Sequence, residues 1–236
     1  MIPNTNPVII DTLYYMLEDL IEKFKKLNIE YYIDGGTLLG AVRNKNIIPW
    51  DDDIDICVFE DKENIINQFQ FSNYKLVKVN FGYKLCLKNG KQIKQNKWQT
   101  HLKKFQNIGL NRKEALLAAS RTYDAKDYND NYEHTFPNID IQIMKKDMDK
   151  YVHAKPDLSP NWYNNAFQYN KDLFPLIDYE LGDMLVKGPN NPIPYLNRYY
   201  GNDWSTHIYT EYNHSTEKKI KIVKYKLEDY YNNVDS

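Results

Sequence analysis

The segment from Tyr31 to Val58 constrains the fold more than any other part of the chain. It reads YYIDGGTLLGAVRNKNIIPWDDDIDICV. Strand-forming residues open it and end at the pair Gly35–Gly36, and a short helix is predicted from Thr37 to Arg43. A loop that contains Pro49 follows, and then an aspartate-rich strand. The segment therefore predicts a strand, a glycine turn, a short helix, a loop and a second strand in close succession.

Four aspartates fall within five residues, in the run Asp51-Asp52-Asp53-Ile54-Asp55. Because strand side chains alternate between faces, Asp53 and Asp55 are expected on one face and Ile54 on the other. Asp51 would join them if the strand begins early enough. Crowded carboxylates repel one another, and a cation that prefers oxygen ligands, Mg²⁺ or Mn²⁺, offsets that repulsion. An acidic turn without a metal is the alternative.

The glycines next to this strand predict a phosphate site. Glycine allows close approach of the backbone to a phosphate, and a helix N-terminus behind it favours negative charge. We expect backbone N–H groups of Gly35, Gly36 and Thr37 to cradle phosphate. Arg43 is expected to supply a fixed positive charge close to the charge that develops during reaction.

The string GGTLLGAVRNKNIIPWDDDIDI resembles the signature of the LicD family, which includes the fukutin-related proteins and belongs to the polymerase-β-like nucleotidyltransferase superfamily. The resemblance implies an α+β fold, with a nucleotidyltransferase-like mixed β-sheet flanked by helices and a family-specific C-terminal elaboration. It also implies a third carboxylate on a later strand.

Residues 136–144 provide that strand. Ile139, Ile141 and Ile143 alternate with Asp140 and Gln142, which is the pattern of a half-buried strand. An aspartate between isoleucines suits a metal edge better than a core, and by resemblance Asp140 is the third carboxylate. From Gln142 the sequence Gln-Ile-Met-Lys departs from the Phe-Pro-Leu-Asp that is common in the family.

The resemblance implies a metal-dependent phosphotransferase. Asp53, Asp55 and Asp140 would hold Mg²⁺ or Mn²⁺, and Asp140 could also draw the proton from the attacking hydroxyl. A phosphoalkyl group, such as phosphocholine or ribitol phosphate, would pass from a CDP-activated donor to a glycan or glycolipid. Lys84 follows an aromatic residue, as in the family, and is the candidate contact to donor phosphate; an exposed strand lysine is the alternative. Asn44 and Asn46 replace the His and Gly that are common in the family, which bears on donor choice.

Two other functions stay open. One is a nucleotidyltransferase that moves a nucleoside monophosphate from a triphosphate onto a small molecule. The other is a catalytically silent module that binds glycan or nucleotide.

Charge is distributed unevenly along the chain. Residues 64–113 contain no Asp or Glu but carry eleven Lys and Arg, while the whole chain has a net charge of −1. This basic block suits an anionic substrate, or it is a solvated lysine-rich face. No nucleic-acid module is recognised, so nucleic acid is not an expected partner.

The remaining elements follow from periodicity and propensity. An amphipathic helix that packs on the sheet is predicted for Pro7–Leu27, with partner binding as the alternative. Further predictions are helices at Glu60–Phe69 and Glu114–Arg121, strands at Tyr74–Val79 and Tyr83–Leu87 with a turn at Asn89–Gly90, and a late helix ended by Gly201, with Trp204 in an aromatic cluster. We expect one domain over residues 1–215 and a partly ordered tail over 216–236.

Cysteine usage and the N-terminal residues bear on compartment. Cys57 and Cys86 lack metal-ligand spacing and suggest no disulfide framework. His101 and His134 are expected to be surface histidines. The N-terminal residues lack the features of a signal peptide and no run is long enough to cross a bilayer, so we expect a soluble cytoplasmic protein. The sequence leaves the oligomeric state open.

Overall fold

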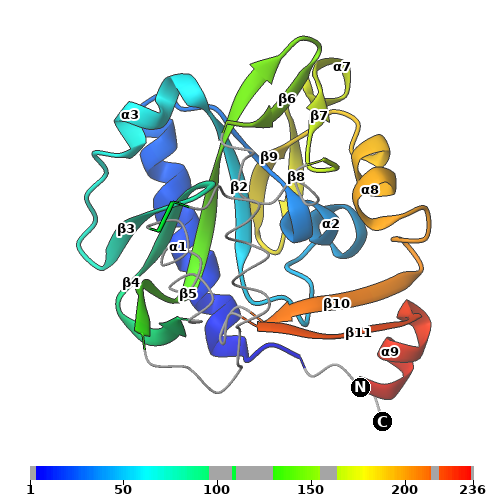
Figure 1. The fold of residues 1–236 in the computed structure, drawn as a ribbon. Coiled ribbons are helices and arrows are strands. Elements are labelled where there is room, and N and C mark those ends of the chain that lie inside the picture. The colour runs from blue at the N-terminus through cyan, green and yellow to red at the C-terminus, as the bar shows by residue number, and fades with distance from the viewer. Residues whose placement is uncertain (1–3, 96–107, 110–129, 155–163, 214–217, 235–236) are drawn as a thin grey trace.

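The protein folds around a mixed β-sheet with helices packed against it (Figure 1). The structure, a computed structural model, describes residues 4–95, 108–109, 130–154, 164–213 and 218–234. The mixed sheet and its flanking helices confirm the predicted α+β fold.

The strand order of the sheet places two distant segments side by side. The five strands that lie in sequence across it are β1 (Tyr31–Ile33), β2 (Ile54–Phe59), β5 (Asp130–Asp147), β4 (Gly82–Gln95) and β3 (Tyr74–Val79). Strands β2 and β5 are parallel, and the other neighbours in this row are antiparallel. Strand β6 (Lys150–His153) pairs with β5, and β7 (Gln168–Tyr169) pairs with β6.

Helix α1 (Pro7–Lys26) covers one face of this sheet. Asn6 caps it by accepting the N–H of Val8 at 2.9 Å, which satisfies one of the unpaired donors of the first turn. The apolar stripe of the helix, including Leu13 and Leu17, is fully buried in one cluster with Ile54, Ile139 and other strand residues. The predicted amphipathic helix and its packing on the sheet are confirmed.

The opposite face of β2 and β5 carries polar residues. Along β2, Ile54 and Ile56 belong to the core beneath α1, so the intervening Asp55 projects from the other face. On β5, Asp140 and Gln142 alternate with buried isoleucines in the same way. A smaller apolar cluster of Tyr32, Cys57, Met144 and Leu173 lies beyond them. The isoleucines of β2 and β5 therefore pack against α1, and the polar residues between them lie together on the opposite face of the sheet.

The other elements connect and flank the sheet. They are α2 (Gly35–Asn44), η1 (Glu60–Lys62), α3 (Glu63–Ile66), α7 (Asn170–Leu173), β8 (Ile177–Leu181), β9 (Met184–Gly188), α8 (Ile193–Tyr200), β10 (His207–Asn213), β11 (Lys218–Lys226) and α9 (Leu227–Val234). Helix α8 ends at Tyr200 with Gly201 as its C-cap, as predicted, and Trp204 lies in the same cluster as Tyr195. Strands β10 and β11 form a hairpin across the predicted boundary at residue 215.

Several local predictions need correction. The predicted turn at Asn89–Gly90 is wrong, because β4 continues to Gln95 through a register shift after Cys86. The predicted helix at Glu60–Phe69 is a 3₁₀ turn followed by the single turn of α3. His134 is buried in the long strand β5 and is not a surface residue. His101 and the helix predicted at Glu114–Arg121 lie outside the described residues.

Strand β2 begins at Ile54, so the prediction that Asp53 lies in this strand is wrong: Asp53, like Asp51, precedes the strand and reaches the site from a loop. Among the described helices, none combines the length and apolar character that crossing a bilayer requires.

Candidate metal centre and active site

A row of three charged residues crosses the sheet. In the parallel pairing of β2 with β5, Asp55 lies opposite Asp140, and in the antiparallel pairing of β5 with β4, Asp140 lies opposite Lys84. Residues directly opposite each other in a sheet have neighbouring Cβ atoms, so strand register alone brings these side chains together. The row joins residues separated by more than 80 positions in the sequence.

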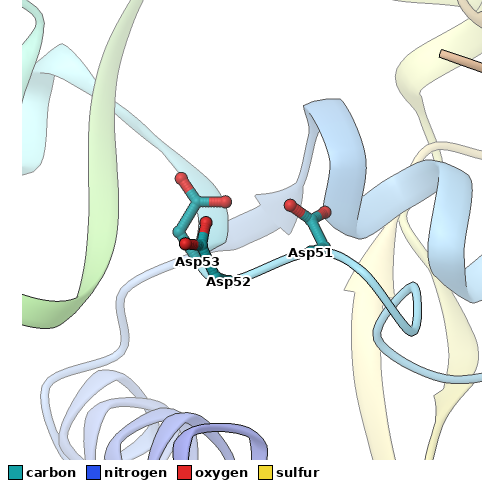
Figure 2. A group of neighbouring side chains, drawn as sticks. All are labelled: Asp51, Asp52 and Asp53. Atoms are coloured by element: carbon teal, nitrogen blue, oxygen red, sulfur yellow. The ribbon is translucent and has the colours of Figure 1, made fainter. Parts of the chain in front are cut away.

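Two groups of carboxylates meet at the start of β2. Asp53, Asp55 and Asp140 each offer an oxygen within 4.8 Å of the others, and so do Asp51, Asp52 and Asp53. Figure 2 shows the second group, with Asp52 and Asp53 close together and Asp51 next to helix α2. Asp53 and Asp140 are buried, and Asp53 belongs to both groups. Three of the predicted ligands therefore converge, and the fourth, Asp51, lies in the adjoining group.

Gly35 and Gly36 make room for these carboxylates. A Cβ on Gly35 would lie 2.4 Å from Oδ2 of Asp55, and a Cβ on Gly36 would lie 2.5 Å from Oδ2 of Asp51. Gly35 also has a φ of +52°, which side chains disfavour. A side chain at either position would therefore displace the carboxylate that faces it.

The first turn of α2 faces the same site. The N–H groups at a helix N-terminus lack intrahelical partners and favour negative charge. Gly35 donates its N–H to the Tyr195 hydroxyl at 3.3 Å. The hydroxyl of Thr37 accepts the N–H of Asp55 at 2.8 Å and so joins the helix to β2. The cradle predicted for Gly35, Gly36 and Thr37 stays a prediction, and its residues lie beside the carboxylates.

Lys84 is a buried partner of Asp140. Its Nζ lies 2.6 Å from Oδ1 of Asp140 and 3.0 Å from Oδ1 of Asn138. The side chains of Lys84 and Asp140 are only 7% and 11% exposed. Buried charges need such pairing, because desolvation of an unpaired charge is costly. Lys84 is therefore no exposed strand lysine; its predicted contact with donor phosphate stays a prediction.

Arg43 points toward the C-terminal part of the chain. Its guanidinium donates to the backbone carbonyl oxygens of Trp204 at 2.9 Å and His207 at 3.4 Å, and it lies 5.6 Å from the centre of the Trp50 ring. Burial lowers the pKa of Arg43, and Asp51 partly counters that effect. The Arg43 side chain, whose role in the reaction stays a prediction, thus connects α2 to Trp204 and to the start of β10.

Asp34 is a polar group that the sequence analysis did not select. It is buried immediately before Gly35, and its Oδ1 accepts the Nε2 of Gln168 at 3.3 Å. Burial raises the pKa of Asp34 to about 6, and hydrogen bonds from Gln168 and Tyr195 counter part of this rise. Asp34 thus joins α8 and β7 to the start of α2.

Asp52 and Gln142 also lie at the site without having been selected as site residues. Asp52 belongs to the loop group of carboxylates. Gln142 donates its Nε2 to Oδ1 of Asp55 at 2.9 Å. The signal for Gln142 was present in the sequence, because it lies two residues after Asp140 and strand side chains two apart share a face.

The donor set fits a hard divalent cation. Each of the two groups presents only carboxylate oxygens, and Mg²⁺ and Mn²⁺ favour such ligands. Neither group contains the thiolate or imidazole ligands that a softer metal prefers. The shared residue Asp53 would allow one cation to contact both groups.

The chain is similar to one described protein family and to several known proteins. A family model described as LicD/FKTN/FKRP, nucleotidyltransferase domain, matches residues 28–147. An uncharacterized protein of Rickettsia typhi is 31% identical over 224 residues, which cover 90% of this chain and 55% of that protein. One of Rickettsia prowazekii is 29% identical over 224 residues, which cover 90% of this chain and 65% of that protein. This chain thus spans less than two thirds of the length of both relatives.

A third relative matches over a short segment only. It is the lipopolysaccharide cholinephosphotransferase LicD of Haemophilus influenzae, 51% identical over 43 residues, or 18% of this chain and 15% of that protein. The family match spans just over half of the chain and contains both groups of converging aspartates. The chain therefore belongs to the LicD/FKTN/FKRP family of nucleotidyltransferase domains.

Proposed function

We propose that this chain is a metal-dependent phosphotransferase that moves a phosphoalkyl group from a CDP-activated donor to a hydroxyl group of a glycan. The observation that carries the proposal is the convergence of Asp53, Asp55 and Asp140 within the family match. The cholinephosphotransferase similarity supports transfer of a substituted phosphate. The donor, the acceptor and the need for metal all belong to the proposal.

Each group of residues has a role in this reaction. Asp53, Asp55 and Asp140 would hold Mg²⁺ or Mn²⁺, which supplies positive charge against the diphosphate of the donor. The N–H groups of Gly36 and Thr37, in the first turn of α2, suit one phosphate of that donor. Gly35 keeps its N–H on Tyr195 and supports the turn.

Asp140 remains our candidate for accepting the proton of the attacking hydroxyl. It is the carboxylate that Lys84 holds in place, at 2.6 Å, so its orientation is fixed before substrate binds. Fixed orientation is what positions a proton acceptor for an incoming hydroxyl.

The test combines activity with binding. Purified protein is incubated with Mn²⁺ or Mg²⁺ and a panel of CDP-alcohols and nucleoside triphosphates, and release of CMP or pyrophosphate is followed by chromatography. Metal-dependent CMP release from one CDP-alcohol, lost in Asp53→Asn, is the expected result. Asp53→Asn should keep its fold by circular dichroism, because the substitution removes a charge at an edge of the core and leaves the side-chain volume nearly unchanged.

Two other outcomes would overturn the proposal. Pyrophosphate release from a triphosphate would identify a nucleotidyltransferase, which the name of the matched domain keeps as the second candidate. A wild-type protein that binds no Mn²⁺ by calorimetry and releases neither CMP nor pyrophosphate would instead identify the catalytically silent module that binds glycan or nucleotide.

A further inference from the structure

Gln142 on β5 lies next to the metal candidates and has no role in the proposed reaction. The residue is 2% exposed. It lies opposite Cys57 of β2 in the parallel register, so it is one diagonal step from Asp55, and its Nε2 reaches Oδ1 of Asp55 at 2.9 Å. Diagonal neighbours on one face of a sheet are within reach of a long side chain.

The contact fixes the orientation of the amide. A carboxylate only accepts hydrogen bonds, so the NH₂ end of Gln142 must face Asp55. The other end, Oε1, is buried and has no hydrogen-bond partner among the described residues. A buried acceptor without a partner costs free energy, and an apolar side chain of similar size would avoid that cost. The hydrogen bond from its NH₂ group to Asp55 is therefore the reason for an amide at this position.

Asp55 is held by two hydrogen bonds, and the site leaves room for its second carboxylate oxygen. Gln142 holds Oδ1, the absence of a side chain at Gly35 leaves room for Oδ2, and the hydroxyl of Thr37 holds the backbone N–H. Asp140 is constrained in a comparable way by Lys84, which Asn138 holds in turn. Each of the two strand carboxylates thus has one oxygen bound to a buried side chain of the sheet.

We propose that Gln142 is a positioning residue, which holds the Asp55 carboxylate in the orientation that lets it share a cation with Asp53 and Asp140. This inference rests on the proposed metal site. Groups that hydrogen-bond to a metal ligand orient it, and losing them commonly weakens metal binding about 10- to 100-fold.

The test is Mn²⁺ titration of the full chain by calorimetry, comparing wild type with Gln142→Met. Methionine matches glutamine in length and removes both polar groups, so the metal-free variant should melt no lower than wild type. Its affinity for Mn²⁺ should fall about 10- to 100-fold. Gln142→Asn, which keeps an amide but is one methylene shorter, should weaken binding similarly and serves if the methionine variant fails to fold.

Gln168 offers a matched control. It is 1% exposed, donates its Nε2 to Asp34 at 3.3 Å, and its Oε1 also lacks a partner among the described residues. Asp34 belongs to neither of the two carboxylate groups. Gln168→Met should therefore leave the Mn²⁺ affinity within about twofold of wild type, because its hydrogen bond reaches no metal ligand.

The outcomes separate this inference from the proposed function. A wild-type protein that binds Mn²⁺ and a Gln142→Met variant of equal affinity would overturn the role of Gln142 and leave the metal site standing. Equal losses in Gln142→Met and Gln168→Met would also overturn it, because affinity would then follow general packing. A wild type that binds no Mn²⁺ would overturn the metal site itself.

Discussion

The two groups of carboxylates reach the site by different structural means. Asp55 and Asp140 lie opposite each other on paired strands, each on a backbone held by the hydrogen bonds of its sheet. Asp51, Asp52 and Asp53 precede the strand, in a loop that begins after α2. Strand register positions Asp55 and Asp140, and contacts from elsewhere must position Asp51, Asp52 and the shared Asp53.

The contacts that hold this loop come from both ends of the chain. Thr5 donates its N–H to the carbonyl of Pro49 at 2.7 Å, and the hydroxyl of Tyr14 binds the side chain of Asn46. The ring of Trp50 lies 4.6 Å from that of Tyr230 on α9, edge to face. Figure 1 shows α9 next to the N-terminal segment. Residues outside the family match therefore support carboxylates inside it.

The difference suggests that the sheet provides a fixed part of the site and that the loop provides a part dependent on the terminal segments. Local stability varies across a protein, and segments with few buried apolar contacts open first. The following experiments test this comparison, from the largest expected effect to the smallest.

The first compares one carboxylate from each group. Asp55→Asn should weaken Mn²⁺ binding roughly 100-fold, because it removes a charge from the group that includes buried Asp53 and Asp140. Asp52→Asn should weaken it by about tenfold or less, because Asp52 is half exposed and its charge is better screened. Calorimetric titration of both variants is the measurement. A larger loss for Asp52→Asn would place the cation in the loop group.

The second tests Lys84 as the buried partner of Asp140. Lys84→Met should lower the stability of the metal-free protein by about 3 kcal/mol, because it leaves a buried carboxylate without its cation. Mn²⁺ should then raise the melting temperature of the variant more than that of wild type, since the metal replaces the missing charge.

Exposed Lys88→Met serves as the control, with no change expected in either quantity. Equal Mn²⁺-induced shifts in Lys84→Met and wild type would show that Lys84 does not compensate the charge of the metal ligands.

The third tests the support of the loop by α9. Tyr230→Ala removes a ring that is 2% exposed and packs on Trp50. Hydrogen exchange at the Asp51 amide, which donates to the carbonyl of Ile48, should speed up about tenfold or more. Amides of Ile56 and Ile141, in the sheet, should exchange as in wild type.

Tyr15→Ala, at a tyrosine that is 67% exposed on α1, should change neither set of amides. If Tyr230→Ala accelerated exchange equally in β2 and in the loop, the two parts of the site would form one cooperative unit and the comparison would fail.

The sequence was informative where a local pattern carries the information. Alternation placed Ile54 and Ile139 in the core and Asp55 and Asp140 on the opposite face, because strand side chains have a period of two. The stripe of α1 likewise gave both the helix and its buried side. The run of aspartates with two glycines before it indicated the candidate site, and the structure explains the glycines by the carboxylate oxygens that they face.

Predictions from local patterns failed where contacts with distant strands decide the structure. The dipeptide Asn89–Gly90 favours a turn, yet β4 shifts register there and continues along β5. In the sequence, His134 is an isolated polar residue. In the structure it is buried, because β5 extends far enough to include it. In both cases pairing with a distant strand outweighs the preference of a few residues.

By itself, the sequence selected the candidate residues for the chemistry and the strand face that Asp55 and Asp140 occupy, because composition and period are local properties. Only the tertiary structure decided that β2 lies parallel to β5, which brings Asp55 opposite Asp140 and within reach of Gln142. Only the tertiary structure likewise decided that β4 pairs with β5, which places Lys84 opposite Asp140. It also decided that the two ends of the chain hold the loop of Asp51. The physical reason is that alternation within a strand fixes the face on which a side chain lies. The residue opposite that side chain depends instead on which distant strand pairs with its own strand.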